Sequence, residues 1–325
     1  MARRALLAFL FLCGSIAFAL TGFSQEPVTL ENYLRRLGYA PIRLTVGDNN
    51  HFFLHGKING KKVRLSLDTG CAITRLIPKA ASGLTPIDPK KVSIDDGFLN
   101  RTHIPGLVLM DTLELGGLQF RNQPAHVGEI EFDFVRSVDD GLLGCDFLAR
   151  NHCIIDCGHG LLFVRGEALP SQAETSLKET LLKSGFKDTG FEVSPGRPVT
   201  CHVALNKKDY GLIVDTGCPW TLLDWECGQQ LGLTALVRPR HLVMNGIGKV
   251  GAHGLQEAQL QTLQIGDLTL ARIYVALADM SAWGLTERGQ WMKNQSGFLG
   301  METLASTAAL LDFGTRTIWV HPAFH

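Results

Sequence analysis

The tripeptide Asp-Thr-Gly occurs twice in this chain in the same setting, once in each half. Each copy follows an apolar run, at residues 65–67 before Asp68 and at residues 212–214 before Asp215. The runs predict strands, and the glycine that follows allows a sharp turn of the backbone. Two such aspartates in matched halves indicate a pair of carboxylates brought together to share one proton.

The two halves are copies of one another over most of their length. The motif aspartates are 147 residues apart, and the same spacing relates Leu30 to Leu177. Downstream the spacing grows to 156, where Gly-Leu-Leu-Gly at 141–144 matches Gly-Phe-Leu-Gly at 297–300. The growth predicts extra loop residues in the second copy, chiefly at 281–296. A repeat this long indicates a duplicated domain and not a solenoid.

A third Asp-Thr-Gly, at residues 188–190, lacks this setting. It follows Gly-Phe-Lys and not an apolar run, and the spacing of 147 places Asp188 opposite Pro41, ahead of the first motif strand. We interpret it as a chance tripeptide in a turn, without a catalytic role.

Composition limits the classes of partner and cofactor. The chain has 325 residues, enough for two ordinary domains, and its 31 basic and 31 acidic residues give no net charge. Without a long basic run or a basic-aromatic stripe, we expect no nucleic-acid partner. The 11 histidines are scattered, and no cysteine–histidine spacing is typical of a metal site, so we predict no metal and no cofactor.

The N-terminus is typical of an export signal. Arg3 and Arg4 precede an apolar stretch at 5–20, and small residues offer cleavage sites near residue 24. We therefore interpret residues 1–24 as a signal peptide and expect a periplasmic or secreted protein. The alternative is an uncleaved membrane anchor, since residues 5–23 are nearly long enough to span a bilayer.

The cysteines leave two alternatives open. Eight are present, and seven remain after removal of Cys13 with the leader, so at least one thiol is unpaired within a monomer. Export permits disulfides. Buried free thiols that pack as small hydrophobic groups are at least as consistent with the pattern.

Glycine-bounded strand patterns predict a mainly β protein in two lobes. We place the first lobe at 25–165, a linker at 166–174 and the second lobe at 175–325, with amphipathic helix patterns at 28–37 and 175–184. Turn residues predict that each motif strand is the second arm of a hairpin. The predicted hairpin strands are 51–58 with 62–67, and 199–205 with 210–214. Further strands are predicted at 107–115, 118–127, 153–164 and 317–320, and short helices at 80–84 and 225–233.

The chain resembles the retropepsin-like aspartic peptidases in their bacterial tandem form, over nearly all of the mature sequence. The specific elements are the apolar strand into Asp-Thr-Gly and a later apolar-apolar-Gly followed by an apolar-Asp strand. The first copy has Gly-Leu-Leu-Gly at 141–144 with Ile155-Asp156, and the second, looser copy has Gly-Phe-Leu-Gly at 297–300 with Leu311-Asp312. The resemblance implies two retropepsin-like, acid-protease β-barrel lobes in a pseudo-twofold arrangement. It also implies a monomer whose lobes pair within one polypeptide.

The resemblance further implies an endopeptidase whose dyad, Asp68 and Asp215, activates water to cleave peptide or protein substrates. One carboxylate would act as general base, and its protonated partner would bind the substrate carbonyl and then protonate the leaving amine. The loop residues beside the dyad would support it. Thr69 and Thr216 are expected to cross-link the loops through hydroxyl-to-backbone hydrogen bonds, and Gly70 and Gly217 to allow close backbone approach.

Two departures from the family pattern stand out. Cys71 and Cys218 follow the motif glycines where the family usually has Ala, Ser or Thr. A flap tip fits residues 245–251, with Gly246 and Gly248, whereas its first-lobe counterpart at 95–105 has a single glycine.

Two other functions are compatible with the same sequence. One is a catalytically inactive protein that binds peptides on the same fold, and the other is an envelope-associated interaction module. Residues 25–37 are also a candidate segment to mask the cleft. Substrate, cleavage preference and pH optimum do not follow from the sequence.

Overall fold

The computed structural model describes residues 29–47, 50–88, 106–128, 139–193, 197–236, 255–280 and 296–322. The predicted leader, both flap candidates with Gly246 and Gly248, and residues 281–295 of the predicted insertion lie outside the described residues. Within the described part of the chain, every helix is too short or too polar to cross a membrane.

The described elements follow the same order in both halves, except that the first half has two additional strands of two residues each. The first half consists of α1 (Leu30–Arg36), β1 (Ala40–Arg43), β2 (Thr45–Val46), β3 (Phe52–Ile58), β4 (Lys61–Leu67), β5 (Arg75–Leu76), α2 (Pro78–Ala81), β6 (Thr85–Pro86), β7 (Leu107–Leu115), β8 (Leu118–Val127), β9 (Gly141–Leu143), α3 (Cys145–Arg150), β10 (Ile154–Asp156) and β11 (Leu161–Val164). The second half consists of α4 (Ser171–Lys183), β12 (Lys187–Glu192), β13 (Thr200–Leu205), β14 (Lys208–Asp215), β15 (Leu222–Asp224), α5 (Trp225–Gln230), β16 (Gln256–Ile265), β17 (Leu268–Ala278), β18 (Gly297–Gly300), α7 (Met301–Ser306), β19 (Leu310–Asp312) and β20 (Thr317–Val320).

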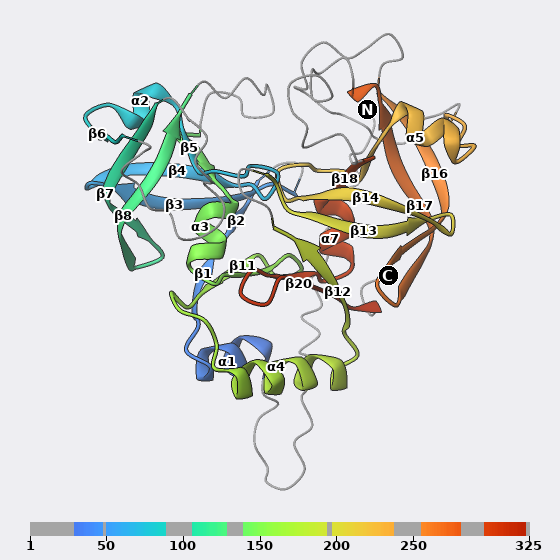
Figure 1. The fold of residues 1–325 in the computed structure, drawn as a ribbon, viewed down its shortest axis with the longest axis horizontal. Helices are drawn as coiled ribbons and strands as arrows, with labels where there is room; N and C mark the ends of the chain where they lie inside the picture. Colours follow the sequence, from blue (N-terminus) through green and yellow to red (C-terminus); the bar gives the residue numbers. More distant parts are fainter. Residues whose placement is uncertain are drawn as a thin grey trace, which may run out of the picture.

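Each half closes into a six-stranded barrel. In the first lobe the ring runs β3-β4-β9-β5-β8-β7 and closes through the β3–β7 pairing. In the second it runs β13-β14-β18-β15-β17-β16 and closes through β13–β16. The barrels lie at the left and right of Figure 1. With 47% strand and 20% helix, the mainly β, two-barrel prediction is confirmed.

The motif strand β4 shows why this sequence forms a barrel wall. Val63, Leu65 and Leu67 alternate with less apolar residues, and all three belong to the main hydrophobic core. Side chains alternate between the two faces of a strand, so this pattern buries one face inside the barrel. Asp68 directly follows this strand, so the barrel wall fixes its position.

A third sheet joins the lobes. Its order is β1-β11-β10-β19-β20-β12, so each half contributes three strands. At its centre β10 pairs antiparallel with its repeat equivalent β19, and Ile155 lies opposite Leu311. Equivalent residues that face each other place the pseudo-twofold axis between them. The lobes are thus connected by main-chain hydrogen bonds in addition to the covalent link.

Helices α1 and α4 cover one face of this interlobe sheet. Leu34 of α1 and Leu181 of α4 are buried with Phe163 and Trp319 of the sheet in one hydrophobic cluster. Figure 1 shows both helices at the bottom of the molecule, away from the loops that follow β4 and β14. The described part of the segment at 25–37 therefore packs on the interlobe sheet and does not mask those loops.

Several element boundaries differ from the predictions. Helix α4 begins at Ser171, four residues before the start of the predicted helix at 175–184. The predicted strand at 153–164 is two strands, because Gly160 adopts a φ of 63° in a turn between β10 and β11. The short helices α3 and α7 were not predicted.

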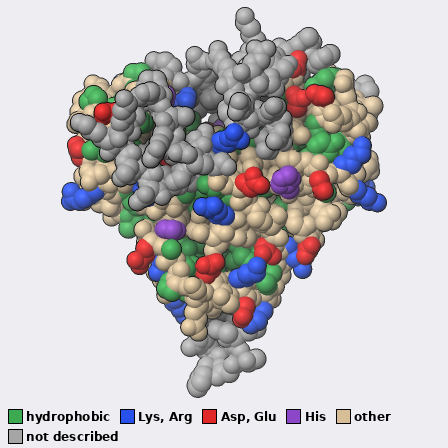
Figure 2. Space-filling view, in the orientation of Figure 1, with side chains coloured by type: hydrophobic (Ala, Val, Ile, Leu, Met, Phe, Trp, Pro, Cys, Tyr) green, Lys and Arg blue, Asp and Glu red, His purple; other side chains and the backbone are tan. Residues whose placement is uncertain are grey.

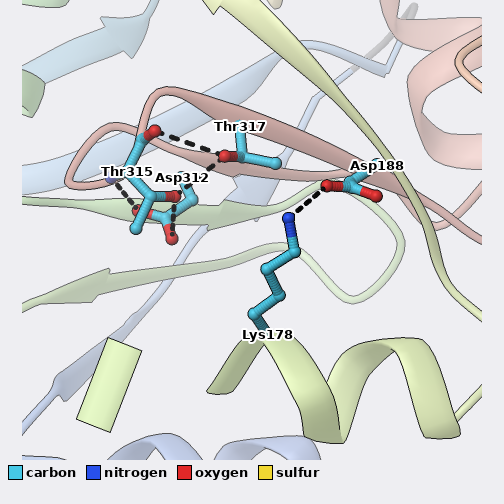
Figure 3. A network of polar contacts seen from close by, with 5 residues as sticks. All are labelled: Lys178, Asp188, Asp312, Thr315 and Thr317. Atoms are coloured by element: carbon cyan, nitrogen blue, oxygen red, sulfur yellow. Dashed lines mark hydrogen bonds and ion pairs between the residues drawn. The ribbon is translucent and has the colours of Figure 1, made fainter. Parts of the chain in front are cut away.

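The predicted turn at the third Asp-Thr-Gly is wrong. Asp188 lies in β12, opposite Trp319 of β20, and its carboxylate forms an ion pair of 3.1 Å with Lys178 of α4 (Figure 3). Only Phe191 of this strand is buried, so the sequence lacks the apolar alternation that predicts a strand. The nearby Asp312 accepts a hydrogen bond of 2.8 Å from the Thr315 hydroxyl, which fixes the turn between β19 and β20.

The described surface on the face shown in Figure 2 carries interspersed acidic and basic side chains. This mixture agrees with the zero net charge of the chain.

Candidate active site

The two Asp-Thr-Gly loops meet between the barrels. Asp68 directly follows β4, and Asp215 is the last residue of β14. Each motif strand pairs in parallel with a strand of its own lobe, so that Leu67 lies opposite Leu143 and Asp215 opposite Gly300. Equivalent strand ends on the two sides of the pseudo-twofold axis therefore direct the two aspartates toward each other.

The two carboxyl groups are in contact, and each lies against the glycine of the other loop. A Cβ atom added to Gly70 would lie 2.6 Å from Cγ of Asp215, and one added to Gly217 would lie 2.8 Å from Cγ of Asp68. A side-chain hydrogen bond joins the two aspartates. Only glycine leaves room for this approach.

Two threonines cross-link the loops by four buried hydrogen bonds. The Thr69 hydroxyl donates to the carbonyl oxygen of Val214 at 2.7 Å and accepts from the Thr216 amide at 3.0 Å. Reciprocally, the Thr216 hydroxyl donates to the carbonyl oxygen of Leu67 at 2.8 Å and accepts from the Thr69 amide at 3.1 Å. Both threonines have no exposed surface. The network fixes the relative position of the two strand ends from which the aspartates extend.

Backbone amides hold each carboxyl group within its own loop. Oδ1 of Asp68 accepts from the Cys71 amide at 3.1 Å, and Oδ1 of Asp215 accepts from the Gly217 amide at 2.7 Å. Both aspartates keep partial exposure at the surface while protein atoms surround most of each carboxyl group. The pair is thus oriented before any substrate arrives.

The surroundings raise the pKa of both carboxyl groups and distinguish them. Burial raises the pKa of Asp68, while the hydrogen bond from Asp215 and the charge of Arg75 oppose that rise. Burial raises the pKa of Asp215 further, because the adjacent negative charge of Asp68 adds to it. Two carboxylates in contact cannot both ionise cheaply, so the pair titrates as a unit and retains one proton.

The apolar-apolar-Gly segments pack behind the two loops. A Cβ atom on Gly144 would lie 2.7 Å from the carbonyl oxygen of Cys71, and one on Gly300 would lie 2.1 Å from that of Trp220. These glycines allow β9 and β18 to approach the backbone of the motif loops. The residues that follow complete the contact with hydrogen bonds, as Met301 donates its amide to the Cys218 carbonyl at 2.8 Å.

A pair of threonines that the sequence patterns did not indicate ties these segments to the loops. Thr74 donates from its amide and its hydroxyl to Oδ1 of Asp146, both at 2.7 Å, and Asp146 is almost fully buried. In the second lobe the hydroxyl groups of Thr221 and Thr303 form a hydrogen bond of 2.7 Å. Thr74 and Thr221 are 147 residues apart, so the repeat spacing could have identified them.

The seven cysteines in the described residues are all free thiols. Those beside the dyad hydrogen-bond within their own loops: Sγ of Cys71 lies 2.9 Å from the carbonyl oxygen of Ile73, and Sγ of Cys218 lies 3.1 Å from that of Trp220. Burial raises the pKa of both thiols, which disfavours the reactive thiolate. No cluster of three or more metal-ligating side chains occurs within the described ranges.

Comparisons with known proteins give three results. Among solved structures, an aspartic proteinase from Irpex lacteus matches with a TM-score of 0.46 and 15% identity, over 88% of this chain and 98% of its own. A retropepsin-like aspartic protease from Rickettsia conorii matches with a TM-score of 0.25 and 24% identity, over 39% of this chain and 89% of its own. No curated protein gives a significant match. The aspartyl protease family profile matches twice, at residues 54–147 and 201–303, around the two motifs in turn. With more than half of its residues matched, the chain belongs to the aspartyl protease family.

Proposed function

We propose that this protein is an aspartic endopeptidase in which Asp68 and Asp215 jointly activate a water molecule against a peptide bond. One observation carries the proposal: two carboxyl groups from equivalent loops contact each other and are held by the reciprocal hydrogen bonds of Thr69 and Thr216. Two carboxyl groups in contact destabilise the folded protein, because both are partly desolvated and their negative charges repel each other. A purely structural role would not require such a pair.

The electrostatic difference between the carboxyl groups assigns their roles. Arg75 favours the ionised form of Asp68, which would remove a proton from the attacking water. Asp215 would hold the shared proton, hydrogen-bond the substrate carbonyl oxygen and stabilise the charge that develops there. Asp215 would then donate its proton to the leaving amine, and Asp68 would keep the proton taken from water. Each carboxyl group thus acts once as acid or base, and the chemistry needs both.

We further propose that the active unit is a single chain. The interlobe sheet takes three strands from each half, and one polypeptide supplies both aspartates. A partner subunit would therefore add no catalytic group. Sedimentation of the active protein should give the mass of a monomer, whereas activity that disappears on dilution together with a dimer would contradict this proposal.

The test is hydrolysis of a diverse peptide library by the purified mature protein and three matched variants. Asp68→Asn and Asp215→Asn should each lower kcat/KM by at least about 10³-fold, because an amide replaces the base or the acid. Asp188→Asn changes the third Asp-Thr-Gly, which pairs with Lys178 far from the dyad, and should retain wild-type activity.

The same experiment separates the inactive alternative. Peptide binding without hydrolysis, unchanged in Asp68→Asn, would favour a binding protein on the protease fold. Hydrolysis that survives in either dyad variant would contradict the shared active site.

A further inference from the structure

The surroundings of the two aspartates differ at one pair of equivalent positions. Arg75 of β5 and Leu222 of β15 are 147 residues apart and are therefore counterparts in the two lobes. In the first lobe Arg75 lies in register with His126 of β8, and in the second Leu222 lies in register with Ala276 of β17. Both ladders are parallel, so register partners share a face. A guanidinium and an imidazole thus stand where the other lobe has two apolar side chains.

The face on which these residues lie is the outer face of each barrel, beside the dyad. Leu76, the next residue in β5, is fully buried in the barrel core, so Arg75 points to the opposite side. In the second lobe Leu222 and Ala276 form a separate small cluster with Cys218, which lies three residues after Asp215. The positive charge of Arg75 correspondingly acts on Asp68 and on Cys71.

Arg75 has no carboxylate partner within the described ranges of the chain. Three other arginines there form ion pairs: Arg64 with Asp139 at 3.1 Å, Arg35 with Glu31 at 2.8 Å and Arg165 with Glu167 at 3.5 Å. Asp68 experiences the charge of Arg75 without forming an ion pair with it. A partly buried guanidinium without a partner retains its donors for an external acceptor, and its planar fork matches a carboxylate.

We propose that Arg75 binds an acidic side chain of the substrate on the first-lobe side of the scissile bond. This inference rests on the proposed peptidase function and names the class of peptide that the site selects. The second lobe offers no such group at the equivalent position, where Leu222 is buried among apolar residues. The preference for Asp or Glu is therefore confined to one side of the cleavage point.

The test compares substrates that differ only in charge. A pooled peptide library first identifies the position at which Asp and Glu are enriched in cleaved sequences. Paired peptides with Glu or the isosteric Gln at that position are then assayed with the wild type, Arg75→Leu and Arg75→Lys. Arg75→Leu copies the second lobe, and Arg75→Lys keeps the charge without the fork.

The ratio of kcat/KM for the Glu peptide to that for the Gln peptide is the decisive quantity. It should be about tenfold or more for the wild type, between that and one for Arg75→Lys, and close to one for Arg75→Leu. The ratio cancels any change that the lost charge causes in the pKa of Asp68, since that change affects both peptides equally.

The outcomes separate this inference from the proposed function. A wild-type ratio near one, or a high ratio that persists in Arg75→Leu, overturns the role of Arg75 even if hydrolysis depends on Asp68. If the wild type cleaves no peptide, the peptidase proposal fails by itself. Affinity selection from the same peptide library by the wild type and by Arg75→Leu then decides whether Arg75 selects acidic peptides: enrichment of Asp and Glu should be seen with the wild type and lost with Arg75→Leu.

Discussion

Replacement of Gly70 by alanine tests the geometry of the dyad directly. The added Cβ would lie 2.6 Å from both Cγ and Oδ2 of Asp215, whereas ordinary contacts begin at 3.4 Å. The loop and the carboxyl group must separate by about 0.8 Å to restore such a contact. A misplacement of this size within an active site costs about 10²-fold in rate. The forced repacking should also destabilise the protein by about 1–3 kcal/mol.

The third Asp-Thr-Gly supplies the matched control. A Cβ atom on Gly190 would meet nothing closer than the Arg316 carbonyl oxygen at 4.0 Å. Gly190→Ala should therefore leave activity unchanged and raise the free energy of unfolding by less than about 1 kcal/mol, through a reduced entropy of the unfolded chain. The two variants make the same chemical change in the same tripeptide, so only the contact with Asp215 distinguishes them.

A double-mutant cycle makes the result independent of activity. Asp215→Ala removes the carboxyl group that the new methyl group would meet, so Gly70→Ala should cost little in that background. Urea unfolding of the four proteins should give a coupling of about 1–3 kcal/mol between the two sites. Additive effects, together with kcat/KM of Gly70→Ala within about twofold of wild type, would refute the contact between the lobes on which the proposed dyad depends.

Other changes have outcomes that follow from the same structure. Thr69→Val keeps the side-chain shape but leaves two buried backbone groups without partners, and should cost about 2–4 kcal/mol in urea unfolding; a loss below about 0.5 kcal/mol would contradict the network. Burial raises the pKa of Glu302 to about 7, so between pH 4.5 and about pH 7 this carboxyl group is protonated in the native state and ionised in the unfolded state. The native state therefore loses stability as the pH rises through this range, and the loss is complete above about pH 7. Glu302→Gln should accordingly be more stable than wild type by about 1–2 kcal/mol at pH 8, a figure lowered for partial exposure, and the difference should shrink at pH 4. Because the pKa of Asp215 is also raised, the free energy of unfolding of Asp215→Asn should exceed that of the wild type by an amount that grows as the pH rises. A difference that does not depend on pH would show that the pKa of Asp215 is not raised. Replacement of both Cys71 and Cys218 by alanine should keep the fold and at least about a third of the activity, because each thiol bonds only a carbonyl of its own loop; a complete loss of activity in the folded protein would assign the thiols a catalytic role.

The parts of the fold that local patterns determine could be predicted. The paired strands β7 and β8 have the predicted ends, Leu107–Leu115 and Leu118–Val127, because alternating apolar residues and a turn with two glycines define them. Helices α3 and α7 have six residues each, too few for a helical period to be visible. In α3 the first four residues are all buried, which removes the polar face that predicts a helix.

The interlobe sheet could not be predicted because its pairings join residues far apart in the sequence. The repeat marks Ile155 and Leu311 as equivalent residues, but equivalence in the sequence does not indicate that their strands pair with each other. In the candidate site, too, some residues could be predicted from the sequence and others could not. Asp68 and Asp215 were identified as a pair because the repeat marks them as equivalent, whereas Arg75 was missed because it differs from its counterpart.

The difference at Arg75 suggests what the tandem arrangement allows. In a symmetric dimer of identical lobes, any cation beside one aspartate would also stand beside the other, and the two carboxyl groups would remain equivalent until a substrate bound. Here the duplicated halves share the interlobe sheet and the threonine network, so the dyad keeps its pseudo-twofold frame. Within that frame a single arginine favours ionisation of Asp68, and Leu222 stands at the equivalent position beside Asp215. Arg75→Leu should therefore raise the pKa of Asp68, and the acidic limb of the pH dependence of kcat/KM should move to higher pH.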